Sequence, residues 1–189
     1  MFAHIVVFLS FIYAIAITHP LASGHELIVE RRRVRWSALL TCWMIASVLL
    51  LVLNWLAIFR LSAVTTWTVG QVLVHILGAV CIYYTCALPA IRAQPGETID
   101  MPDYFARNRV PILGAFALFG LVALLVNVVD FHTGGPAANG TIDRIYRVMP
   151  NIVAETAGLI VRATWFQWLV VLFVLGRLAY VMAMSIIVG

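Results

Sequence analysis

The chain has 189 residues, of which 63% are hydrophobic and only 11% are charged. This composition argues against a soluble domain, because several apolar runs approach the roughly 20 residues that a helix needs to cross a bilayer. Twelve arginines, without a single lysine, outnumber eight acidic residues and give a net charge of +4. The arginines flank the apolar runs and form no basic tail, so we expect membrane lipids and no nucleic acid as partners.

The apolar runs predict one all-α domain, a polytopic transmembrane helical bundle. Five spans are expected, at 2–19, 36–59, 67–88, 111–131 and 165–187. Surface or amphipathic segments are expected at 24–35, 100–110 and 141–164. A sixth, short crossing within the last of these segments is the alternative.

Prolines and capping residues predict where the helices end. Pro20 should end the first helix, because proline lacks the backbone N–H and disfavours helical geometry in the residue before it. Ser23 and Glu26 have the spacing of a capping box, so a second helix should open beside Ser23 and continue to Phe59. Pro111 should begin or kink the fourth span.

A cluster of four arginines between the first two apolar runs predicts the orientation of the chain. Three more arginines, in the segments 90–110, are expected on the same side, with Arg162 nearer the opposite side. The positive-inside rule then places the N-terminus outside and the C-terminus inside. We expect the cluster to contact lipid headgroups. Its members are Arg31, Arg32, Arg33 and Arg35.

Polar side chains within the predicted spans form the first candidate site. Gln71 and His75 are four residues apart and share one helical face. Asn54, Asn127 and Asp130 are expected in the same outer half of the membrane, which predicts an outward-opening polar pocket with His75 at its floor. The alternative is that these residues only form hydrogen bonds between or within helices.

Arg177 is expected about 18 Å inside a core that is about 30 Å thick. The predicted topology places it in the inner half, close to Tyr84. It could serve an anion or proton pathway, or it could extend to the inner headgroups or form a structural salt bridge. Glu155 and Arg162 are seven residues apart and are interpreted as the polar side of an interfacial helix.

Motifs of known chemistry do not occur in the chain. It has no nucleophile elbow, zinc-protease motif, phosphate-binding loop or paired-carboxylate signature, so we favour a function other than catalysis. The cysteines and histidines lack metal-site spacing, and no two histidines are expected at the same depth, as haem b between two helices requires. No cofactor is therefore expected.

The start of the chain resembles a family. The residues Phe11-Ile12-Tyr13-Ala14, then Thr18-His19, the arginine cluster and a tryptophan-containing second span resemble uncharacterised bacterial integral membrane proteins. The resemblance ends with the second span. It implies a location in the bacterial inner membrane and transfers neither an activity nor a catalytic residue.

The leading functional hypothesis is a homo-oligomeric channel or transporter-like protein for ions or small solutes. Its pathway would be lined by His75, Gln71, Asn127 and Asp130 outside and by Arg177 inside. A structural or regulatory subunit, bound to a membrane-protein partner within a larger complex, is the second hypothesis. A haem-binding redox subunit is the third.

Overall fold

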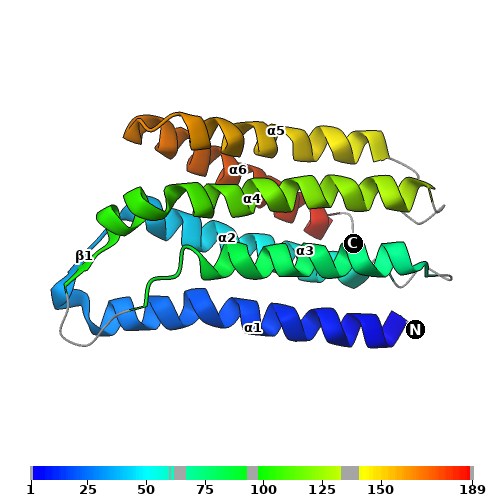
Figure 1. Cartoon of the computed structure of the whole chain (residues 1–189), viewed down its shortest axis with the longest axis horizontal. Coiled ribbons are helices and arrows are strands. Elements are labelled where there is room, and N and C mark those ends of the chain that lie inside the picture. Colours follow the sequence, from blue (N-terminus) through cyan, green and yellow to red (C-terminus); the bar gives the residue numbers. More distant parts are fainter. Residues whose placement is uncertain (1, 60, 62–66, 93–97, 133–140, 188–189) are drawn as a thin grey trace.

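The computed structural model describes residues 2–59, 61, 67–92, 98–132 and 141–187. In this part of the chain six helices run back and forth along one axis (Figure 1). All of them except α5 are long and apolar enough to cross a membrane, as the hydrophobic runs predicted. The helices are α1 (Phe2–Val29), α2 (Ala38–Ile58), α3 (Val69–Ala87), α4 (Met101–His132), α5 (Thr141–Ile160) and α6 (Thr164–Ile187).

Helix α1 continues through Pro20, so the predicted end of the first helix at this residue is wrong. Ala16 and Leu27, on either side of the proline, are both buried, and packing on both sides holds the helix through it. The expected capping box is wrong as well. The Ser23 hydroxyl instead accepts a hydrogen bond from the backbone N–H of Ile91, at 3.0 Å.

The arginine cluster breaks the chain between α1 and α2, where one continuous helix was expected. A short 3-10 helix, η1 (Arg31–Arg33), is followed by the strand β1 (Val34–Arg35). Helix α2 begins only after Ser37, whose side chain accepts a hydrogen bond from the Leu40 backbone N–H. Three consecutive arginines gain more from water and headgroups than from continuing a buried helix, and a serine cap lets the next helix start afresh.

Strand β1 pairs in parallel with β2 (Ile99–Asp100), which immediately precedes α4. Arg35 and Asp100 form an ion pair at 3.0 Å across this pairing. The pairing brings the arginine cluster beside the start of α4.

Helix α4 is one helix of 32 residues, about 48 Å long at 1.5 Å per residue. The surface or amphipathic segment expected at 100–110 forms its first part, so of the two possibilities at Pro111 the start of a helix is wrong. Pro111 lies on the exposed side, where the carbonyl that it leaves without a helical partner can be hydrated. Ile112 and Leu113 beside it are fully buried and hold the helix in place.

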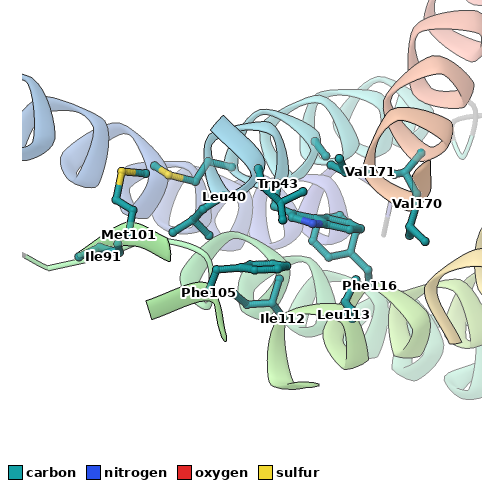
Figure 2. Packing of buried hydrophobic residues seen from close by; sticks show 14 of the residues in the cluster. Leu40, Trp43, Ile91, Met101, Phe105, Ile112, Leu113, Phe116, Val170 and Val171 are labelled. Carbon is teal, nitrogen blue, oxygen red and sulfur yellow. The ribbon is translucent and has the colours of Figure 1, made fainter. Parts of the chain in front are cut away.

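The core consists of two clusters that share α2. In the first, shown in Figure 2, Trp43 of α2 packs against Phe116 of α4 with ring centroids 4.8 Å apart, and Val171 of α6 belongs to the same cluster. In the second, Leu9 and Tyr13 of α1 pack with α2 and α3. In the bundle α3 packs mainly against α1 and α4, α2 packs mainly against α6, and α5 packs mainly against α4.

Eight of the twelve arginines lie at one end of the bundle. At one end, on the left in Figure 1, η1, β1, the start of α4 and the α5–α6 turn lie together. We call it the arginine end; its arginines are Arg31, Arg32, Arg33, Arg35, Arg92, Arg107, Arg109 and Arg162. The two chain termini lie at the other end, which we call the terminal end.

Arg162 therefore lies at the arginine end, whereas the sequence had predicted it nearer the opposite side. The Arg109 side chain donates from Nη1 to the Val161 carbonyl oxygen at 3.0 Å, which fixes the α5–α6 turn at the arginine end. Helix α6 consequently runs from the arginine end to the terminal end, opposite to the direction that the five-span arrangement gave it. The reason is α5, which turns back along α4 through the length of the bundle (Figure 1).

Candidate functional site

The polar residues of the expected pocket lie in the half of the bundle near the terminal end. Asn54 on α2 donates from Nδ2 to the Leu50 carbonyl oxygen of its own helix, at 2.9 Å. Asn127 on α4 donates in the same way to the Ala123 carbonyl oxygen, at 2.7 Å. Both amides therefore satisfy a donor within the helix that carries them. The side chain of Asp130 lies outside the part of the chain that the structure describes.

Gln71 and His75 build the start of α3. Gln71 Oε1 accepts from the Thr68 backbone N–H at 3.0 Å, and Thr68 Oγ1 accepts from the Gln71 backbone N–H at 3.2 Å. This reciprocal capping box explains why a buried glutamine stands at this position. His75 Nδ1 lies 2.8 Å from the Gln71 carbonyl oxygen, and its ring meets the edge of Trp67. These contacts fit the structural interpretation of the pair.

The remaining predicted residues lie apart from this group. Tyr84 is 52% exposed and its ring contacts Tyr83, near the arginine end. In the arginine cluster, Arg33 pairs with Glu30 at 2.7 Å, while Arg31 and Arg32 are exposed. The exposed members are free to meet headgroups, as expected for residues at a membrane surface.

Helix α5 buries a charged-type side chain and exposes mostly apolar ones, which is the reverse of what an interfacial helix does. The side chains that it buries include Glu155, which is only 4% exposed. Between residues 149 and 160 it exposes Met149, Pro150, Val153, Thr156 and Ile160. All of these except Thr156 are apolar. The interpretation of Glu155 and Arg162 as one solvated polar face is therefore wrong, since Glu155 faces the bundle and only Arg162 is exposed.

Two glycines seat α5 against its neighbours. A Cβ atom added to Gly120 of α4 would lie 2.5 Å from Cγ1 of Ile152, so the two helices approach closely there. A Cβ atom added to Gly158 would lie 3.3 Å from Leu113 of α4 and 3.5 Å from Val170 of α6. Glu155 stands on the same buried face between Ile152 and Gly158. Its side chain is consequently directed at α4 and α6.

The end of α5 is held by two buried polar side chains. Arg109 is buried and donates from Nη2 to the Leu159 carbonyl oxygen at 3.1 Å, in addition to its bond with Val161. Gln167 of α6 donates from Nε2 to the carbonyl oxygens of Gly158, at 2.9 Å, and Val161, at 2.6 Å. The last carbonyls of α5, which have no partner within the helix, thereby receive donors from α4 and α6.

Three buried oxygens near this turn lack a donor. Asn151 Oδ1, Glu155 Oε2 and Gln167 Oε1 have no hydrogen-bond partner within the described part of the chain. Leaving a buried acceptor unpaired costs about 1–3 kcal/mol, and more if it is charged, so such groups mark a functional position or a missing ligand. Glu155 lies on the face of α5 that meets α4 and α6, Asn151 precedes it by one helical turn, and Gln167 is bonded at the α5–α6 turn.

The register between α5 and α6 adds Arg177 to this group. Gly158 contacts Val170, and the two helices are antiparallel. Seven residues back along α5 therefore correspond to seven residues forward along α6, which sets Asn151 level with Arg177. Glu155 is one helical turn from that level. We call Asn151, Glu155, Gln167 and Arg177 the polar seam.

The polar seam differs from the site that the spans predicted. The sequence had indicated Arg177, but in the half of the membrane near Tyr84, whereas the structure has it beyond the middle of α6 towards the terminal end. Asn151 and Glu155 were missed as site residues. Their four-residue spacing, opposite the apolar Met149 and Val153, was the available signal for a polar face turned inwards.

The described residues offer no metal centre of the usual kind, since no three histidine, cysteine, aspartate or glutamate side chains gather among them. The polar seam consists of one carboxyl group, two amides and one guanidinium group, all on α5 and α6. No family model, curated protein or solved structure matches this chain.

Proposed function

We propose that α5 is a sixth membrane crossing. Its outward face is apolar from Met149 to Ile160 except for Thr156, which suits lipid, and Glu155 turns towards protein. The apolar stretch Val148–Ile160 is about 20 Å long, shorter than the hydrocarbon core. Local thinning of the bilayer or snorkelling of flanking residues accommodates such a stretch.

With six crossings, both termini lie on one side of the membrane. The positive-inside rule assigns the arginine end to the cytoplasm and both termini to the outside, in the inner membrane of a bacterium. Epitope tags at the two termini test this orientation. Protease added to intact spheroplasts should remove both tags, and removal of the N-terminal tag alone would restore the five-span topology.

We further propose that the chain is a transporter-like protein for ions or small solutes, with the polar seam as its membrane-embedded site. The observation that carries this proposal is the buried, unpaired carboxyl oxygen of Glu155 within an apolar bundle. An ionisable group at membrane depth is costly, and such residues in membrane proteins usually mark an ion or substrate pathway. Arg177 at the adjacent level supplies an opposite charge within the same seam.

The experiment is a flux measurement on the full chain reconstituted in liposomes. A panel of cations, anions, protons and small solutes is offered to wild type, Glu155→Gln and the control Asp103→Asn. Asp103 is exposed and paired with Arg107, so its variant makes the same chemical change at the surface. We expect flux in wild type and in the control, and background flux in Glu155→Gln. Absence of flux across the panel, or unchanged flux in Glu155→Gln, would contradict the proposal.

The same preparation distinguishes the alternative. A homo-oligomer in mild detergent is the state that we propose for the transporting protein. A second protein that co-purifies at fixed stoichiometry, together with absence of flux, would instead favour a subunit of a larger membrane complex.

A further inference from the structure

We infer that Glu155 holds a proton in the folded bundle, so that the proton is the ion bound by the polar seam. The role of this proton in transport rests on the function proposed above. Its presence on Glu155 rests only on the surroundings of the side chain.

Acceptors without a donor gather along the polar seam around Glu155. Within the described residues, the buried atoms of Asn151, Glu155 and Gln167 that have no hydrogen-bond partner are all oxygens. An ionised carboxylate only accepts hydrogen bonds, whereas a protonated carboxyl group also donates one. A proton on Glu155 Oε2 therefore converts one surplus acceptor into a donor at the level of the carboxyl group, one helical turn from the guanidinium donors of Arg177.

The possible acceptors for this proton lie before and after Glu155 along α5. Asn151 precedes Glu155 by four residues and shares its helical face. Gln167 Nε2 donates a hydrogen bond to the carbonyl oxygen of Gly158. Gly158 follows Glu155 by one helical turn on the same buried face. One acceptor thus lies on each side of the carboxyl group along α5.

The helices packed against Glu155 carry few charges close to it. On α4, the facing stretch 113–120 contains no ionisable residue. Arg109, further along α4, already donates to the carbonyl oxygens that end α5. On α6, Arg177 is the charged residue nearest by register, and it is level with Asn151. An ionised carboxylate with an apolar helix on one side is expensive, so the neutral acid is favoured.

Arg177 gives the site its second state. When Glu155 releases its proton to water, the carboxylate needs a compensating charge, and the guanidinium group lies one helical turn away. A displacement of α6 by a few ångströms along α5 would allow the two groups to pair. The exchange is an acid–base step in which the carboxyl O–H bond breaks and a water molecule takes the proton, and uptake reverses it.

Infrared spectroscopy of the full chain in lipid tests the inference. At neutral pH we expect a carboxylic-acid C=O band that shifts in deuterated water, is absent in Glu155→Gln and remains in Asp103→Asn. Glu155→Asp retains a carboxyl group and should show a shifted band, which separates loss of the proton from loss of the fold. Only carboxylate bands in wild type would overturn the inference.

Sodium is the competing occupant. Replacing sodium by a large organic cation should leave the acid band unchanged if a proton occupies the site. An acid band that appears only after sodium is removed would overturn proton occupancy in favour of a sodium site. The outcomes also separate the two proposals: a persistent acid band without any flux contradicts only the transport function, and flux without the band contradicts only the bound proton.

Discussion

Helices α2 and α3 and the α5–α6 pair satisfy polar residues inside the bundle in different ways. In the first two helices, Asn54, Thr85 and Ser47 each donate to a carbonyl oxygen of their own helix three or four residues earlier. In the α5–α6 pair, the carboxyl oxygen of Glu155 finds no donor within the described residues. The difference follows from chemistry, because the first three side chains carry a donor and an ionised carboxylate carries none.

Position within the helix matters as much as residue type. Gln71 Oε1 finds a donor because it stands at the start of α3, where backbone N–H groups lack helical partners. Glu155 stands inside α5, where the backbone N–H groups are already used by the helix. Donors on its own helix satisfy a polar residue cheaply, whereas an internal acceptor must depend on its neighbours or on a bound ion.

The largest effect on stability is expected at the turn that closes the polar seam. Arg109→Ala removes two hydrogen bonds from a buried cation to the end of α5 and should lower the free energy of unfolding by about 2–4 kcal/mol. Arg107→Ala, which breaks an exposed pair, should cost less than about 1 kcal/mol. Thermal unfolding in detergent measures the stability of both variants. An equal loss of stability in the two would show that the Arg109 hydrogen bonds contribute no more than an exposed ion pair.

A smaller effect is expected where α5 crosses α4. Gly120→Ala places a methyl group against Ile152 and should destabilise the bundle by about 1–3 kcal/mol through overpacking. Gly114→Ala meets nothing within 4 Å and should be neutral or slightly stabilising. Unfolding in the same detergent measures both, and a harmless Gly120→Ala would mean that α5 is not seated closely on α4.

The predicted outer pocket should tolerate substitution. Asn127→Leu removes a hydrogen bond made within α4 and should change the free energy of unfolding by less than about 1 kcal/mol, with flux unchanged. Glu155→Leu should abolish flux. Loss of flux in Asn127→Leu would return the pathway to the pocket lined by His75 and Gln71.

The smallest effect concerns the surface at the arginine end. A hydrogen bond from the Asp103 backbone N–H, and then the Arg35 guanidinium, hold the pKa of the Asp100 carboxyl below its ordinary value. The unfolded chain therefore takes up a proton at Asp100 at a higher pH than the folded chain does. The ionised Asp100 carboxylate stabilises the folded chain fully above the ordinary pKa of 3.8, and this stabilisation is lost as the pH falls below that value. Asp100→Asn should flatten the acid limb of a plot of unfolding temperature against pH; an unchanged limb would show that Asp100 contributes nothing.

Local sequence patterns predicted the helices well because hydropathy acts over each run separately. The bounds of α3 and α6 lie close to the predicted spans at 67–88 and 165–187. The helix end predicted at Pro20 is wrong, and α4 does not start at Pro111, since buried neighbours such as Ala16 and Ile112 hold those helices through the prolines. A proline rule describes an isolated helix and contains no information about packing.

By itself, the sequence determined that this chain consists of apolar helices, whereas the break at the arginine cluster between α1 and α2 appeared only in the structure. Only the tertiary structure decided which way Glu155 faces and at which end α6 begins. Asn151 and Glu155 form the same narrow polar face whether α5 lies on a membrane surface or inside the bundle. The choice depends on Gly120, Gly158 and Arg109, which belong to contacts between helices and leave no periodic signal within any one of them.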